Sequence, residues 1–194
     1  ETTSVLAAAF PATVGAMDGA PPWARYAAND LLIAQRTALL RQRAASIVES
    51  LLTGDLMWFV ERVLEAQLED MTSEIAELEQ WLAEDRQILL FDPAGDGRVA
   101  EVFGDLESAP NIGVVVPGIT NDRSNFSEGA GGFRVSARNI HERAVELGIG
   151  DVATIAWLGY DTPDDLVAAT DRHPDQAAGS LAKFLTGLDA AVDH

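Results

Sequence analysis

The sequence has 194 residues, 47% hydrophobic and 23% charged, a composition typical of a globular protein of about one domain. Its formal net charge of −18 argues against non-specific nucleic-acid binding and against docking on anionic lipid, because both need a basic surface. With no cysteine, disulfide frameworks and thiol nucleophiles are excluded. No apolar run approaches the roughly 20 residues of a membrane span. We expect a soluble protein, and the compartment stays open, cytoplasmic by default with secretion as the alternative.

The N-terminal third is predicted to be an arm followed by a helical hairpin. Residues 1–20 are rich in alanine and have no basic start, so we predict a loosely packed arm and not a signal peptide. Residues 21–86 form the predicted cap-like hairpin. Pro21 and Pro22 favour a helix start, and leucines then recur at helical spacing up to Leu52. The first helix ends at Thr53-Gly54, and Asp55 is the expected cap of the second helix.

The second helix carries the clearest periodic signal. Its apolar residues fall alternately four and three apart, at Leu64, Leu68, Met71, Ile75, Leu78 and Leu82. This spacing predicts a heptad seam, and acidic residues occupy most positions between its members. Two long helices joined by a short turn should pack on each other in cis, with a helix of another protein as the alternative partner. The acidic face argues against a membrane-active helix.

Residues 87–194 are predicted to form one α/β domain with four strands. Residues 88–91 and 99–103 flank a turn at 93–97 and predict a β-hairpin. The valine-rich run 112–116 predicts a strand buried on both faces. Further on, the pattern predicts a helix over 133–147, a buried strand over 152–158, and helices over 164–171 and 175–192. The two strands with the helix between them make a βαβ unit.

Both strands of the βαβ unit end on the same rim, where open α/β sheets bind their ligands. The first strand runs into Pro117-Gly118-Ile119-Thr120-Asn121, and the second into Gly159-Tyr160-Asp161. A tight turn at Gly118 would let the amides of Ile119 and Thr120 point at an anion. The alternative is an ordinary strand-to-loop turn.

Common catalytic and cofactor motifs are missing from the sequence. It has no Gly-x-Ser-x-Gly elbow, no His-Glu-x-x-His pair, no Walker A loop and no Gly-x-Gly-x-x-Gly after a strand. Asp92 and Asp96 resemble the start of a calcium loop, but Ala94 and Phe103 stand where further carboxylates belong. We therefore predict no metal ligand and no cofactor.

Three segments in a fixed order carry a family resemblance: Leu-Leu-Phe-Asp-Pro-Ala-Gly-Asp-Gly-Arg (89–98), Val-Val-Val-Pro-Gly-Ile (114–119) and Ala-Trp-Leu-Gly-Tyr-Asp-Thr-Pro (156–163). From residue 21 onward the chain resembles an actinobacterial α/β-hydrolase family whose nucleophile lies in a Gly-His-Ser-Tyr-Gly-Ser elbow. The resemblance implies an α/β fold, with a helical hairpin followed by the N-terminal half of an α/β-hydrolase sheet. It implies oxyanion backbone amides at Gly118, Ile119 and Thr120, and a pocket rim at Asn121, Tyr160 and Asp161.

By this resemblance the nucleophile elbow lies beyond residue 194, so no catalytic residue is assigned in this chain. We expect the N-terminal part of a serine hydrolase, esterase- or lipase-like, that contributes an oxyanion loop and a pocket wall. Without a fifth strand, residues 112–116 would form an apolar sheet edge, which native proteins avoid. The edge would be covered by a second polypeptide, by a C-terminal half of a longer chain, or by self-association into a homo-oligomer. The alternative is a non-catalytic interaction or scaffold protein that uses the acidic hairpin.

Overall fold

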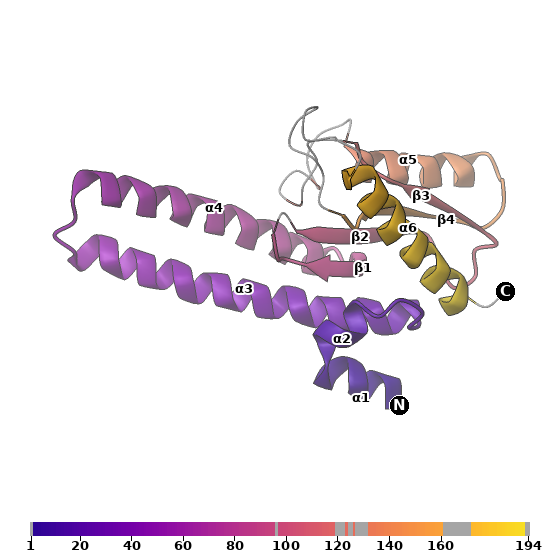
Figure 1. Ribbon diagram of the computed structural model, residues 1–194, viewed down its shortest axis with the longest axis horizontal. Helices are drawn as coiled ribbons and strands as arrows, with labels where there is room; N and C mark the ends of the chain where they lie inside the picture. Colours follow the sequence, from indigo (N-terminus) through magenta and orange to yellow (C-terminus); the bar gives the residue numbers. More distant parts are fainter. Residues whose placement is uncertain are drawn as a thin grey trace. The chain divides into compact units, whose positions relative to one another are not determined.

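A computed structural model describes residues 2–95, 97–118, 123, 126, 132–160 and 172–192, without the side chains of 172–176. The chain divides into two compact units, one of residues 1–29 with 87–194 and one of residues 30–86. The predicted division into arm, hairpin and sheet domain stays a prediction. In chain order the elements are α1 (Thr2–Ala9), α2 (Pro11–Gly15), α3 (Pro22–Thr53), α4 (Trp58–Ala83), β1 (Gln87–Asp92), β2 (Arg98–Phe103), β3 (Asn111–Val115), α5 (Phe133–Glu146), β4 (Val152–Leu158) and α6 (Arg172–Ala191) (Figure 1).

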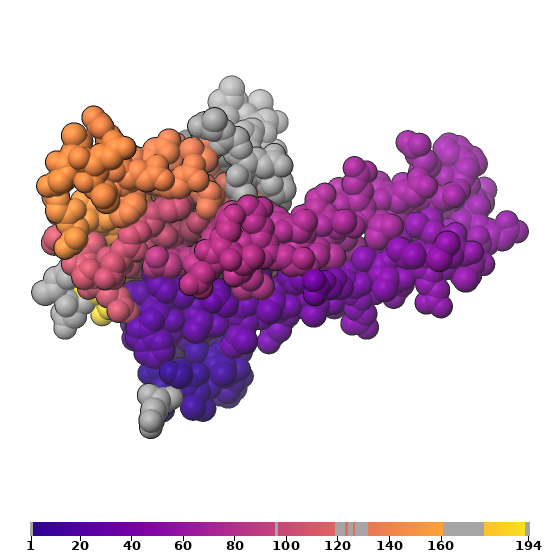
Figure 2. All heavy atoms as spheres, turned by 180° about the vertical axis from the view of Figure 1, so that it is seen from behind, coloured from indigo at the N-terminus to yellow at the C-terminus, as the bar shows by residue number. Residues whose placement is uncertain are grey.

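The unit of residues 30–86 is the predicted helical hairpin, formed by most of α3 and by α4. Arg36 makes two hydrogen bonds of 3.0 Å to the Glu74 carboxylate, and Arg41 pairs with Glu79, so the two helices pack on each other in cis. The heptad seam of α4 is partly or fully buried, while most positions between its members are exposed. Figure 2 shows the side chains of the two helices packed against each other.

The predicted cap of the second helix is wrong. α4 begins after Met57, and no side chain caps its first turn. The N-cap position is held by Met57, two residues after Asp55, and methionine has no side-chain oxygen that could accept a hydrogen bond from the first free amides of the helix.

The first residues are helical, where the sequence predicted a loosely packed arm. α1 and α2 bury Ala7 and Val14 in a small apolar cluster with Ala24 and Ala28 from the start of α3. Alanine has the highest helix propensity, and Pro11 stands at the first position of α2, where proline is favoured. Helix propensity and the apolar cluster therefore explain why this segment is helical, although its composition alone predicted a loosely packed arm.

The sheet has the strand order β1-β2-β4-β3. β1 and β2 form the predicted antiparallel hairpin, and β2 also pairs antiparallel with β4. β3 and β4 are parallel, with Asn111 opposite Val152 and Val115 opposite Ala156. The βαβ unit is therefore present, and β4 is the sole neighbour of β3 among the described strands.

Helices cover both faces of this sheet (Figure 1). One face packs on α6 in the main core, formed by Leu89, Ala100, Val102, Ala153, Ile155, Trp157, Phe184, Leu188 and Val192, among others. α5 covers the opposite face, where the Thr154 hydroxyl donates a hydrogen bond of 2.7 Å to the Ala137 carbonyl. No helix in the described residues is long and apolar enough to cross a membrane.

The prediction that β3 is buried on both faces is wrong. Asn111 is exposed, and the other residues of β3 are only partly buried. β3 lies at an edge of the described sheet, whereas β4 has neighbours on both sides and buries almost all of its residues. An apolar strand sequence does not distinguish a central strand from an edge strand.

Candidate functional site

The candidate site is the rim at which β3 and β4 both end. Because these strands are parallel, their carboxyl ends lie at the same edge of the sheet. Pro117 and Gly118 continue the chain after β3, and Tyr160 follows β4. The Tyr160 hydroxyl donates a hydrogen bond of 2.9 Å to the Pro117 carbonyl. From the sequence, the two segments were expected at one rim because their strands are parallel. The structure adds a direct hydrogen bond between them.

Aromatic packing holds the Tyr160 ring in place. The ring stacks on Trp157, with centroids 6.0 Å apart and an interplanar angle of 25°, and Trp157 lies 5.6 Å from the ring of Phe184 in α6. A Cβ at Gly159 would come within 2.2 Å of the Trp157 ring, so this stack requires glycine there. Burial raises the pKa of Tyr160 further above its ordinary value, which lies well above neutral pH, so the hydroxyl is a hydrogen-bond donor.

The hydrogen bond from Tyr160 also determines the direction of an amide. The described residues contain no cis peptide bond, so the N–H of Gly118 points away from the carbonyl of Pro117 in the same peptide plane. Because Tyr160 binds that carbonyl, the Gly118 N–H is directed away from Tyr160. We conclude that Tyr160 orients the first peptide of the loop after β3.

Gly118 itself differs from the expectation. It does not adopt the positive φ that favours glycine, so a turn in the left-handed conformation does not explain this residue. Among the described residues, no atom lies within 4 Å of a Cβ built at Gly118. Ile119, Thr120, Asn121 and Asp161, the remaining predicted site residues, lie outside the described residues.

A buried ion pair between the sheet and α5 was missed in the sequence. Glu101 of β2 and Arg134 of α5 form two hydrogen bonds of 2.6 and 2.8 Å, with side chains 3% and 10% exposed. The Arg134 guanidinium also lies 5.5 Å from the ring centroid of Phe103. A signal was present, because Glu101 is the one charged residue within the apolar run 99–103. Its partner, 33 positions later, is not visible in any local pattern.

His141 and Asp92 have structural partners. His141 Nδ1 lies 2.9 Å from the Val152 carbonyl, which ties α5 to the start of β4. The Asp92 carboxylate accepts a hydrogen bond of 3.0 Å from the Ala94 amide and pairs with Arg98 within the β1–β2 turn. Asp96 lies outside the described residues. In the part of the chain that the structure describes, no cluster of three or more His, Asp or Glu side chains could hold a metal ion.

Comparison with known proteins agrees with this architecture. Uncharacterized proteins of Mycobacterium bovis and of two strains of Mycobacterium tuberculosis are 38% identical to this chain over 115 residues. The match covers 55% of this chain and 43% of each relative, so the chain spans less than half of the relatives' length. No solved structure is significantly similar to it. A protein-family model described as "Alpha/beta hydrolase" matches residues 92–194, which is more than half of the 194 residues. The chain therefore belongs to this alpha/beta hydrolase family.

Proposed function

We propose that this chain is the N-terminal part of a serine hydrolase that acts on an ester or related acyl substrate. In this proposal the chain supplies the oxyanion loop after β3 and a wall of the pocket after β4. The nucleophilic serine and the rest of the triad come from residues outside 1–194. The observation that carries the proposal is the rim at which Tyr160 binds the Pro117 carbonyl.

The sheet supports a site completed by further residues. Among the described strands, β3 pairs only with β4, so its second edge is available to another strand. A strand placed there would end beside Gly118, at the same rim, if it ran parallel to β3. The relatives are more than twice as long as the region that matches, which leaves room for such a strand and for its nucleophile.

The chemistry assigned to this rim is stabilisation of an oxyanion. A serine attacking an acyl carbonyl forms a tetrahedral intermediate whose oxygen carries a negative charge. In α/β-hydrolase sites, one backbone N–H comes from the residue after the nucleophile and another from the loop after the third strand. Gly118, Ile119 and Thr120 are the proposed source of the second donor, with Tyr160 as a positioning residue.

The proposal is tested by deleting one amide in the assembled hydrolase, that is, this chain together with the polypeptide that carries the nucleophile. Ile119→Pro removes the N–H, whereas Ile119→Ala retains it and controls for loss of the side chain. We expect Ile119→Pro to lower kcat for p-nitrophenyl butyrate by about 10²–10³-fold, the usual effect of losing one oxyanion donor. Ile119→Ala should keep kcat within about threefold of the parent. Equal kcat values for the two variants would refute the oxyanion assignment.

A second candidate function is a non-catalytic interaction protein, and the turn end of the hairpin favours it. Leu52, Met57 and Trp58 are 80%, 63% and 75% exposed, and the Trp58 and Phe59 rings contact each other edge to face. Exposed apolar clusters of this kind often mark protein interaction sites. The acidic residues that flank this cluster would then favour a basic partner.

A serine-directed fluorophosphonate probe discriminates the two functions, provided that it is applied to the assembled species. The hydrolase predicts a second chain that carries Gly-His-Ser-Tyr-Gly and becomes labelled. The interaction protein predicts an unlabelled assembly that dissociates when Trp58 is changed to serine. Labelling of the second chain that persists in Trp58→Ser would contradict the interaction function.

A further inference from the structure

Two ion pairs distinguish the two long sides of the hairpin formed by α3 and α4, which run side by side (Figure 1). In each helix, the residues that face the other helix form a seam with alternating spacings of four and three; on α3 these are Ile33, Thr37, Leu40, Ala44, Ile47 and Leu51, all buried or partly buried. Arg36 and Glu74 each precede a seam residue by one position, whereas Arg41 and Glu79 each follow one. One residue advances about 100° around a helix, so residues that follow the seam by one position lie on the same side as Arg41. We call this side of the hairpin the Arg41 side.

The Arg41 side carries three large, exposed apolar residues. Val48 and Leu52 each follow a seam residue of α3 by one position and are 39% and 80% exposed. Trp58, 75% exposed, stands seven positions, about two helical turns, before Glu65, which follows the seam residue Leu64. All three apolar residues therefore lie on one side, next to the turn that joins the two helices. We call this group of three the apolar strip.

A row of carboxylates runs along the same side of α4. Glu61, Glu65 and Glu69 are exposed and four positions apart, so they lie one above the other on the helix surface. Like charges at this spacing destabilise a helix. Arg62 at the edge of the row leaves its net charge negative, and the basic residue of α3 on this side, Arg41, is already paired. A basic partner would supply the opposite charge that the row lacks.

We propose that the Arg41 side binds one amphipathic, basic helix of another protein. The inference rests on the interaction function proposed above in one respect, that the turn end of the hairpin binds a protein, and it adds the class of partner. The apolar strip and the carboxylate row follow the helix axes, and a third helix can pack along the groove between two helices. The partner helix therefore presents leucine or isoleucine at three- and four-residue spacing, with lysine or arginine in a row beside them.

Charge separates this occupant from a second copy of the chain. A second hairpin would bring an identical row of carboxylates to the interface. The formal net charge of −18 would add repulsion between the two copies. The described surface thus favours a partner of opposite charge over self-association.

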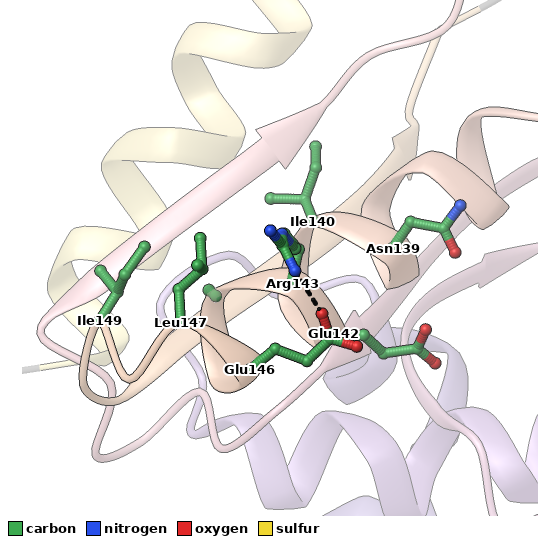
Figure 3. A pocket seen from close by; sticks show the side chains of 8 residues that line it. Asn139, Ile140, Glu142, Arg143, Glu146, Leu147 and Ile149 are labelled. Atoms are coloured by element: carbon green, nitrogen blue, oxygen red, sulfur yellow. Dashed lines mark hydrogen bonds and ion pairs between the residues drawn. The ribbon is translucent and has the colours of Figure 1, made fainter.

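The exposed apolar residues of α5 give no comparable indication of a partner. They line a hollow and comprise Ile140, Leu147 and Ile149. The ion pair beside them, Arg143–Glu146, consists of opposite charges that cancel (Figure 3). The hairpin differs from α5 because its charges specify the chemistry of the occupant.

The test measures binding of three synthetic peptides to the full chain by fluorescence anisotropy at physiological salt. The basic peptide has three heptads with leucine at a and d and lysine at e. The acidic peptide has glutamate in place of lysine, and the proline peptide has a proline in its middle heptad, which interrupts the helix. We expect the basic peptide to bind at least about tenfold more tightly than the other two and to gain helical circular dichroism on binding.

Matched variants separate binding at the Arg41 side from attraction by net charge. Asp70 and Leu39 each precede a seam residue by one position, so they lie on the opposite side of the hairpin. Glu65→Lys should weaken binding of the basic peptide about fivefold, and Asp70→Lys, with the same change in charge, less than about twofold. Leu52→Ser should weaken it about tenfold, and Leu39→Ser less than about twofold. Circular dichroism checks the fold of each variant.

Other outcomes overturn the inference. Equal losses in Glu65→Lys and Asp70→Lys would mean that only the net charge attracts the peptide. Equal binding of the basic and proline peptides would exclude a helix as the occupant. Without peptide binding, dimers that Leu52→Ser dissociates would identify a second copy, and a shift of tryptophan fluorescence with phosphatidylcholine vesicles that Trp58→Ser abolishes would identify a lipid surface.

Failure of the interaction function itself is distinguishable from failure of the helix assignment. If the basic peptide does not bind but Trp58→Ser still dissociates the native assembly, the turn end binds a protein that is not a basic helix. If Trp58→Ser leaves that assembly intact as well, the interaction function fails together with the inference.

Discussion

Breaking the buried ion pair between Glu101 and Arg134 should destabilise the sheet unit strongly. Arg134→Met would leave a carboxylate whose side chain is 3% exposed without the guanidinium that now donates two hydrogen bonds of 2.6 and 2.8 Å. Removal of one partner from a buried pair typically costs about 3–5 kcal/mol, because the remaining charge cannot be hydrated. We therefore expect Arg134→Met to lower the free energy of unfolding by about that amount.

The double variant Glu101→Met/Arg134→Met tests the physical reason. It removes both charges and replaces them with apolar groups, which is often neutral or stabilising by about 1–4 kcal/mol. The double variant should therefore be more stable than Arg134→Met alone. Recovery of stability would show that the cost comes from a buried carboxylate that has lost its guanidinium, and not from a lost packing contact.

The assay is urea unfolding followed by circular dichroism, with hydrogen exchange of α5 as a local readout. Arg143→Met is the matched control on the same helix, because it breaks the exposed Arg143–Glu146 pair, with side chains 65% and 64% exposed. Exposed pairs of this kind contribute only about 0.2–1 kcal/mol. If Arg134→Met costs no more than Arg143→Met, the argument from burial is wrong.

Three further predictions concern single residues. Tyr160→Phe removes the hydrogen bond to the carbonyl after β3 and should lower the free energy of unfolding by about 0.5–1.5 kcal/mol in urea titrations. Burial, together with the nearby Asp85, raises the pKa of Asp30 from 3.8 to about 6, so the folded state binds this proton more tightly than the unfolded state. Stability should therefore fall as the pH rises from 4 to 6, and Asp30→Asn should be more stable than the parent above pH 6, by about 1–2 kcal/mol after solvent screening. Gly104 has a φ of +94°, and a Cβ there would come within 2.7 Å of the His141 ring, so Gly104→Ala should lower the melting temperature, with a cost of about 1–3 kcal/mol or more.

Each of these predictions has its own check. A stability of Tyr160→Phe equal to that of the parent would mean that the hydroxyl does not hold the loop. For Asp30→Asn, the difference from the parent should vanish below pH 4, and a difference independent of pH would contradict the assigned cause. Gly150→Ala is the control for Gly104→Ala, because Gly150 has a φ of +95° and no described atom lies within 4 Å of a Cβ built there. If Gly104→Ala and Gly150→Ala lower the stability equally, backbone strain alone explains the loss, and the contact with the His141 ring contributes nothing.

Local pattern determined the secondary structure of this protein over most of its length. The sequence predicted a strand over 152–158, and β4 is Val152–Leu158. The heptad spacing of α4 predicted its buried side, and the turn signals at 93–97 predicted the β1–β2 hairpin. These features depend on residues a few positions apart, which is the range over which periodicity and turn chemistry act. The family resemblance rested on short motifs of the same kind.

Only the tertiary structure decided which distant residues meet. Tyr160 and Pro117 are 43 positions apart, Arg134 and Glu101 are 33 apart, and neither pair has a signature in the intervening sequence. The same holds for β3, whose valines suit a central strand but lie at an edge of the described sheet. An apolar sequence predicts that a segment forms a strand whose faces are packed against other elements. The path of the whole chain determines which strands lie beside it. The candidate site depends on both contributions. The local sequence predicts the turns that follow β3 and β4, and the parallel pairing of these two strands brings the turns into contact.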